Sequence, residues 1–265
     1  MGVRFLDDVI EVNRFPLRQI RKATLRSRKI GLGVMGFAEM LILQGISYAS
    51  KDALKAAEDI MGFINRIARE ESERLGLERG SFPAFEDSRY ASASAMRNAT
   101  VTTVAPTGTI SIIAGTSSGI EPLFAISFVR HVLAGARMIE GNRLFEEEAK
   151  RRGIFSQDLM AEVARKGFLS EIEGIPKDML NLFTTALEID PEQHVKVQAA
   201  FQKHTDNAVS KTVNLASDTT VDDVARVYNL AYDLGCKGVT VFRYGSRSQV
   251  LYVNEETVPG CKYCG

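Results

Sequence analysis

The chain has 265 residues, of which 45% are hydrophobic and 25% charged, and its 33 basic side chains balance its 33 acidic ones. A chain of this length and composition can bury a sizeable core and would form one large domain or two small ones. The neutral charge without a basic stripe argues against nucleic-acid binding, and no apolar run is long enough to cross a membrane or to serve as a signal peptide, so we expect a cytoplasmic protein.

Helical periods alternate with short β-branched runs along the chain, which is typical of an α/β protein with parallel strands joined by crossover helices. The predicted helices, in chain order, span residues 50–75, 191–209 and 221–234. The predicted strands span residues 99–104, 211–215 and 237–242. Residues 78–94 and 166–177 are predicted to be loops.

Residues 31–36, Gly-Leu-Gly-Val-Met-Gly, match the dinucleotide-binding pattern G-x-G-x-x-G. That fingerprint needs a buried apolar strand before its first glycine, whereas residues 24–30 are strongly basic. It also needs an acidic residue at the end of a second strand about 20 positions later, where this chain begins a long helix. We therefore favour close backbone packing of these glycines, and a nicotinamide-dependent dehydrogenase stays as a third hypothesis.

Residues 106–122 place hydroxyl groups and unhindered amides directly after the predicted strand 99–104. A loop at the carboxyl end of a parallel strand is a common position for ligands, and hydroxyl groups beside a glycine can bind phosphate oxygens. The candidate phosphate-binding residues are Pro106, Thr107, Gly108, Thr109, Ile110 and Ser111. The alternative for so short a motif is a Ser/Thr-rich turn between two elements.

The amphipathic helices have predicted inward faces. For helix 50–75 this face consists of Leu54, Ala57, Met61, Ile64, Ala68 and Leu75. For helix 221–234, which Thr220 can cap and Gly235 can end, it consists of Val221, Val224, Ala225, Tyr228, Ala231 and Tyr232. His204 lies on the inward stripe of helix 191–209, so we expect a hydrogen-bonded core histidine, whereas His194 receives no role.

The chain contains three cysteines, which are too few for a disulfide framework. Cys236 precedes a strand and is expected to pack as a small apolar residue. Cys261 and Cys264 form a Cys-x-x-Cys pair, which suits thiol–disulfide exchange but is also half of a zinc site. We therefore divide the chain into an α/β unit, residues 1–245, and a flexible tail, residues 246–265. The tail thiols could act as a redox shuttle, bind zinc or be inert.

Five segments, residues 4–10, 28–37, 106–122, 202–215 and 235–247, together resemble the large catalytic subunit of ribonucleotide reductases, specifically the adenosylcobalamin-dependent members. The resemblance implies that the chain forms the later half of a ten-stranded α/β barrel. It implies that residues 106–111 bind the phosphate of a ribonucleoside diphosphate. It also implies that Cys261 and Cys264 reduce the disulfide left by turnover and are recharged by thioredoxin or glutaredoxin.

The resemblance further implies that adenosylcobalamin is the cofactor and that the complete enzyme is a homo-oligomer. Relatives that receive their radical from a second subunit carry two adjacent tyrosines on the last barrel strand, and the matching positions here are Phe242 and Arg243. That relay is absent, which agrees with the cobalamin-dependent members. No residue of this chain is assigned to cobalamin or to a metal.

Half a barrel would expose an unpaired sheet edge, so we expect a missing N-terminal half as partner. The family's radical cysteine lies upstream of the matched segments, and no cysteine precedes Cys236. We therefore expect an oxidoreductase segment that supplies phosphate binding and redox thiols but is inactive alone. The alternative is a non-catalytic nucleotide-binding or assembly remnant of that enzyme.

Overall fold

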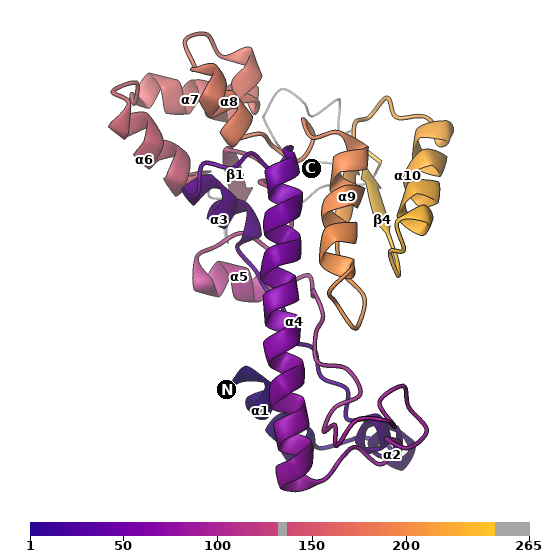
Figure 1. The fold of residues 1–265 in the computed structure, drawn as a ribbon. Helices are drawn as coiled ribbons and strands as arrows, with labels where there is room; N and C mark the ends of the chain where they lie inside the picture. The colour runs from indigo at the N-terminus through magenta and orange to yellow at the C-terminus, as the bar shows by residue number, and fades with distance from the viewer. Residues whose placement is uncertain (132–136, 247–265) are drawn as a thin grey trace.

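A computed structural model describes residues 1–131 and 137–246, with the side chains of residues 128–140 left out (Figure 1). Its elements are α1 (Gly2–Val12), α2 (Arg18–Ser27), α3 (Phe37–Leu43), α4 (Lys51–Arg79), α5 (Gly108–Ala114), β1 (Ser127–His131), β2 (Arg137–Gly141), α6 (Arg143–Arg151), α7 (Gln157–Lys166), the 3-10 helix η2 (Leu169–Glu171), α8 (Lys177–Leu182), α9 (Pro191–Gln202), β3 (Thr212–Leu215), α10 (Val221–Asp233) and β4 (Thr240–Arg243). No helix in these ranges is both long and apolar enough to span a membrane.

Four extended segments lie side by side in parallel. Leu32 bridges Thr102, Val104 bridges Val209, and β3 pairs with β4. Helices occupy each connection between successive segments, as the sequence predicts. Only β3 and β4 are regular strands in this array. The hydrogen bonds between residues 207–210 and residues 102–104 extend over too few residues to form a regular strand pair. The predicted strand 99–104 is therefore reduced to bridges, and the array does not by itself establish half a barrel.

Helix α4 runs through most of the length of the molecule (Figure 1). Ser50 caps it by accepting a hydrogen bond from the Ala53 amide, and Asp52 lies in its first turn, where a negative charge is favourable. Its inward stripe includes Ala57 and Met61, both with no exposed surface. This helix is confirmed and extends to Arg79, four residues beyond the predicted end.

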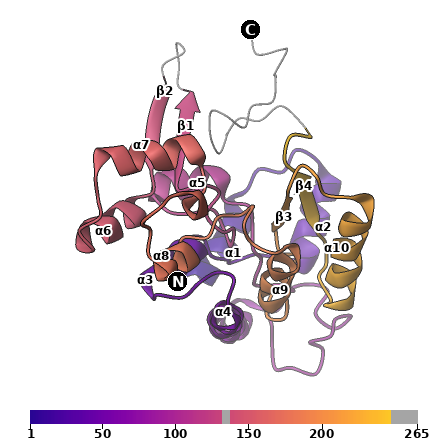
Figure 2. The same ribbon diagram turned by 90° about the horizontal axis from the view of Figure 1, so that it is seen from above.

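Viewed along α4, the remaining elements lie on two sides of it. The hairpin β1–β2 with α6 and α7 lies on one side, and α9, β3, β4 and α10 lie on the other (Figure 2). The hairpin, in which Ser127 pairs with Gly141, is an antiparallel element that the sequence analysis does not predict. Phe37 of α3 contacts Phe201 of α9 edge-on with 4.9 Å between ring centroids, so the core connects both sides across α4.

Helices α9 and α10 are confirmed with changes. Helix α9 ends at Gln202 rather than residue 209, because the Thr205 hydroxyl and the Gln202 amide group form hydrogen bonds to local carbonyls there. Helix α10 begins with the capping box of Thr220 and Asp223, as its sequence predicts.

The predicted inward face of α10 is wrong in part. Val221 and Tyr232 are each 84% exposed, whereas Val227 and Ala231 are buried against β3 and α9. Ala231 belongs to the predicted face, whereas Val227 lies one position before Tyr228 and packs in the cluster that contains Val213 and Leu215 of β3.

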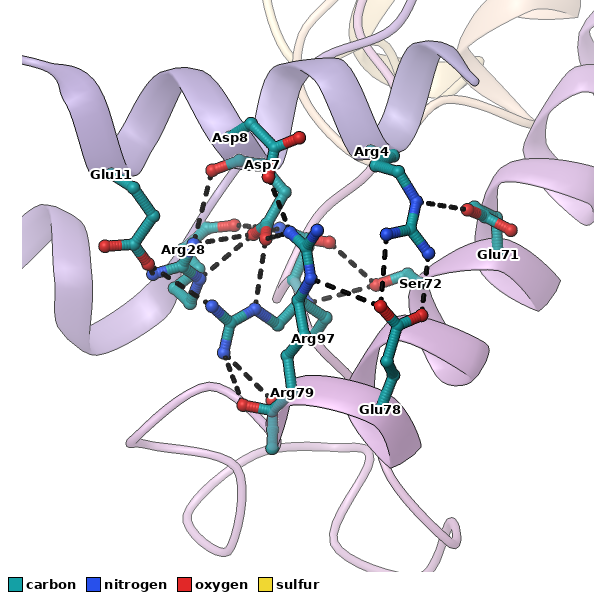
Figure 3. Close-up of polar contacts among 12 residues, drawn as sticks. Arg4, Asp7, Asp8, Glu11, Arg28, Glu71, Ser72, Glu78, Arg79 and Arg97 are labelled. Carbon is teal, nitrogen blue, oxygen red and sulfur yellow. Dashed lines mark hydrogen bonds and ion pairs between the residues drawn. The ribbon is translucent and has the colours of Figure 1, made fainter.

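Charged side chains from α1 and α4 form a polar network with Arg28, which follows α2, and Arg97, which follows α4 (Figure 3). Asp7 is fully buried and accepts hydrogen bonds from Arg28, Arg97 and Asn98. Burial alone would raise the pKa of Asp7, but these three donors lower it below its ordinary value. Arg4 adds a two-bond contact from α1 to Glu78 on α4. The network therefore joins α1 to α4.

Candidate functional site

The predicted phosphate loop follows Val104 in the second extended segment and returns at Glu121 beside β3. Thr107 has a left-handed backbone (φ 54°), which is uncommon for a β-branched residue. Its Oγ1 accepts a hydrogen bond of 2.7 Å from the Gly119 amide, and the Ser118 hydroxyl donates to the Pro106 carbonyl at 2.7 Å. These two bonds join the entry and exit of the loop and hold its open conformation.

The tip of the loop faces solvent. Pro106, Gly108, Thr109 and Ile110 are exposed, and a side chain built on Gly108 would meet no atom within 4 Å. The first amides of a helix have no intrahelical acceptors, so those at the start of α5 can donate to an external group. The tip therefore has room for an anion beside a hydroxyl and several amide donors.

Ser111 lies differently from the other candidates. It is 3% exposed, and its hydroxyl donates to the Gly108 carbonyl at 3.1 Å. In this conformation Ser111 stabilises the turn, and its contact with phosphate stays a prediction.

The glycines of residues 31–36 pack closely against neighbouring segments of the chain. A Cβ on Gly31 would lie 2.4 Å from Thr103 Cγ2, and one on Gly33 would lie 2.1 Å from the Thr103 carbonyl oxygen. Gly36 has φ +80° and donates its amide to the Ser117 carbonyl at 2.8 Å. The glycine segment thus supports the far end of the phosphate loop, and the interpretation as close packing is confirmed.

A buried ionic cluster lies where the loop returns to the sheet. The Lys211 side chain has no exposed surface, and its Nζ donates to Glu121 Oε2 at 2.7 Å. It also lies 2.8 Å from His194 Nδ1 and donates to the Thr212 carbonyl. The second carboxylate oxygen, Glu121 Oε1, accepts the Thr212 amide at 2.7 Å. The end of the loop is therefore bound to the start of β3.

The protonation states in this cluster follow from burial. Burial, followed by the positive charge of Lys211, lowers the pKa of His194 to about 3, so the imidazole is neutral near pH 7. Burial also lowers the pKa of Lys211, and the adjacent Glu121 carboxylate opposes that change. Burial raises the pKa of Tyr48, whose hydroxyl donates to the Ile120 carbonyl at 2.7 Å.

Sequence reasoning missed this cluster. It gave His194 no role, yet His194 is fully buried, whereas His204 is half-buried beside Gly62. The only available signal was Lys211 directly before a β-branched run, because a lysine that begins a buried strand needs a partner.

The cysteines divide between described and undescribed residues. Cys261 and Cys264 lie outside the described residues. Cys236 is half-buried beside Val227 and Ala231, and burial raises the pKa of its thiol, which agrees with the predicted apolar packing. Phe242 and Arg243 both lie on β4, paired with Asn214 and Leu215.

Comparison with known proteins gives one consistent family. The family model described as "Ribonucleotide reductase, barrel domain" matches residues 1–96 and 91–242. A vitamin B12-dependent ribonucleoside-diphosphate reductase of Thermoplasma acidophilum is 53% identical over 252 residues, which are 94% of this chain and 33% of that protein. The enzyme of the same name from Mycobacterium tuberculosis (strain CDC 1551 / Oshkosh) is 50% identical over 95% of this chain and 36% of its own length.

A solved structure supports the same fold. The Actinobacillus ureae class Id ribonucleotide reductase alpha subunit matches with a TM-score of 0.78 at 20% identity, covering 92% of this chain and 44% of that chain. At that identity the likeness concerns the fold alone. The chain spans about a third of the length of the curated relatives described above.

Proposed function

Because this chain belongs to the ribonucleotide reductase barrel family, we propose that it is a segment of a vitamin B12-dependent ribonucleoside-diphosphate reductase. The segment forms the later half of the ten-stranded barrel, and the remaining part of the enzyme supplies the other half. The parallel order of the segments at residues 32, 102–104, 209–215 and 240–243 supports this placement. The complete enzyme converts ribonucleoside diphosphates to deoxyribonucleotides for DNA synthesis and forms a homo-oligomer.

In this proposal the loop from Pro106 to Ser111 binds the diphosphate of the substrate. The observation that carries it is the exposed polar loop at the carboxyl end of a parallel segment, with open space at Gly108. Thr109 and the amides beside it donate hydrogen bonds to the phosphate oxygens, and Thr107 holds the loop open through Gly119. The chain thereby orients the ribose toward reactive groups on the remainder of the enzyme.

The tail supplies reducing equivalents. The Cys261 and Cys264 thiols give up two electrons and two protons, forming a disulfide between them, while the disulfide left at the reacting centre becomes two thiols. Thioredoxin or glutaredoxin then reduces the tail disulfide. The Cys-x-x-Cys pattern supports this role.

The proposed cofactor of the complete enzyme is adenosylcobalamin, as the names of the relatives indicate. The described residues do not form a binding site for a cobalt centre. His194 uses one ring nitrogen with Lys211 and the other with the Ala186 carbonyl, and no group of three metal-binding side chains lies among the residues that the structure describes. We therefore assign no residue of this chain to cobalamin and derive no step through it.

The test uses a chimera in which this chain replaces the matching third of the Thermoplasma acidophilum enzyme, hereafter the chimera. Calorimetric titration with ADP should show about tenfold weaker binding for Thr109→Val, because one hydrogen bond to a charged phosphate is lost. Thr24→Val is the control, since Thr24 lies in α2 on the amino side of the parallel segments. Equal ADP affinity of Thr109→Val and the unmodified chimera would contradict the assignment.

The alternative, a non-catalytic remnant, predicts nucleotide binding without turnover. Formation of dADP by the chimera separates the two, since a remnant forms none even when ADP binds.

A further inference from the structure

The buried ammonium of Lys211 has a complete set of acceptors. An ammonium group carries three N–H donors, and the three partners of Nζ are Glu121 Oε2, His194 Nδ1 and the Thr212 carbonyl. With no exposed surface and no unused donor, Lys211 cannot itself bind a ligand in this conformation. Its role must act through the groups that it holds.

The histidine fixes the direction of one of these bonds. His194 Nε2 lies 2.9 Å from the Ala186 carbonyl, which only accepts, so the proton is on Nε2 and Nδ1 carries the lone pair. Nδ1 therefore accepts from Lys211. Because the imidazole is neutral, Glu121 is the anion that contacts the buried cation among the residues that the structure describes.

Glu121 connects the Lys211 cluster to the end of the phosphate loop. Its carboxylate spans the Lys211 ammonium and the Thr212 amide, so the residue is held at both oxygens. The preceding residues are fixed as well, because Tyr48 donates to the Ile120 carbonyl and Gly119 donates to Thr107 Oγ1. The backbone of residues 119–121 thus connects two hydrogen bonds, from Lys211 to Glu121 at one end and from the Gly119 amide to the left-handed Thr107 at the other.

We propose that Lys211 is a positioning residue for phosphate binding: through Glu121 it holds residues 119–121, and through them Thr107, in the conformation that leaves the loop tip open. This inference rests on the proposed function. It assigns the affinity for the diphosphate to a side chain that never touches it.

The first test compares Lys211→Met with the unmodified protein in the chimera, by calorimetric titration with inorganic pyrophosphate. Without the ammonium, the Glu121 carboxylate loses its cation and leaves the start of β3, so we expect pyrophosphate affinity to fall at least about tenfold. Binding of adenosine, which lacks phosphate, should be unchanged. Lys203→Met is the matched control, because Lys203 forms a 2.8 Å pair with Glu58 in solvent.

The rescue variant is Glu121→Gln combined with Lys211→Met. It removes both charges, yet the side-chain oxygen of glutamine can still accept the Thr212 amide, so pyrophosphate affinity should return to within about threefold of the unmodified protein. A side chain that only stabilised the fold would change the melting temperature and leave the affinity of the folded protein as it was.

Each outcome decides the inference. If folded Lys211→Met binds pyrophosphate as tightly as the unmodified chimera, the positioning role is wrong while phosphate binding stands. If the unmodified chimera binds no pyrophosphate, the proposed function and this inference both fail. Should Lys211→Met not fold, Glu121→Gln alone is compared with the double variant. The inference predicts tighter binding by the double variant, which contains no unpaired ammonium, and equal binding would overturn it.

Discussion

Thr107 and Thr109 stand two residues apart in the phosphate loop, and the structure separates their roles. Thr107 accepts a hydrogen bond from the Gly119 amide, whereas the exposed Thr109 hydroxyl has no hydrogen-bond partner among the described residues. We predict that Thr107→Ala lowers the free energy of unfolding by about 1–2 kcal/mol, because the half-buried amide is left unpaired. Thr109→Ala should change it by less than about 0.5 kcal/mol. Urea unfolding at pH 7 measures both, and equal effects would argue against the Gly119–Thr107 hydrogen bond.

His194 provides the pH dependence at the residue scale. The pKa of His194 in the folded chain, about 3, lies below its ordinary value of 6.5. Between these two pH values the unfolded chain binds a proton at His194 and the folded chain does not. The stability contributed by His194 is therefore complete above pH 6.5 and is lost progressively as the pH falls from 6.5 toward 3. Between pH 6.5 and 5 the slope approaches about 1.4 kcal/mol per pH unit.

The measurement is urea unfolding at several values between pH 7 and 5. His194→Gln does not titrate at this position. Its free energy of unfolding should therefore fall less steeply with decreasing pH, by the amount that uptake of one proton contributes. A variant that keeps the slope of the unmodified protein would mean that His194 is not buried as a neutral imidazole.

Single residues differ in how far the sequence could predict them. The loop at Thr107–Ser111 could be proposed from the sequence, since its hydroxyl groups and glycine directly follow an apolar run. The Lys211–Glu121 pair was not, because its partners are 90 positions apart and meet only when the loop returns to β3. Burial of a lysine depends on that tertiary contact, and no local pattern records it.

At the scale of elements, two glycines of α4 test the packing of this helix. A Cβ on Gly62 would lie 3.5 Å from the His204 ring, an ordinary contact, whereas a Cβ on Gly76 would lie 2.8 Å from the Met96 backbone nitrogen. Gly62→Ala should raise the free energy of unfolding by about 0.5–1 kcal/mol through helix propensity. Gly76→Ala should lower it by about 1–3 kcal/mol, since the backbone at Met96 must move.

Thermal unfolding of the two variants gives the comparison directly. If Gly76→Ala raises the melting temperature as Gly62→Ala is expected to do, residues 95–97 do not approach α4 this closely.

Helix existence was more predictable than helix orientation. Caps and apolar periods located α4 and α10, since these signals are local. The inward face of α10 was assigned partly wrongly: Ala231 is buried as predicted, but Val227 is buried with it while Tyr228 and Tyr232 are exposed. The hairpin β1–β2 was missed because its register depends on pairing between residues 127–131 and 137–141.

At the scale of the whole molecule, we propose that this chain supplies phosphate binding and the tail thiols, whereas the remainder of the reductase supplies the reactive groups. We predict that the isolated chain forms no dADP from ADP with adenosylcobalamin and a dithiol, whereas the chimera does. In the chimera, Cys261→Ser with Cys264→Ser should abolish turnover driven by thioredoxin and preserve turnover driven by a small dithiol, which reaches the reacting centre without the tail.

Product analysis by chromatography checks this prediction, with Cys236→Ser as the control because Cys236 packs beside α10. Undiminished thioredoxin-driven turnover after loss of Cys261 and Cys264 would exclude the shuttle. Loss of turnover with both reductants would favour a structural or zinc-binding role for the tail thiols.

The most direct test of phosphate binding by this chain is a crystal structure of the chimera with ADP. The account predicts phosphate oxygens within about 3 Å of the Gly108 and Thr109 amides and of the Thr109 hydroxyl, with the Gly119–Thr107 bond intact. Phosphates bound at another surface, with the loop at residues 106–111 empty, would contradict it.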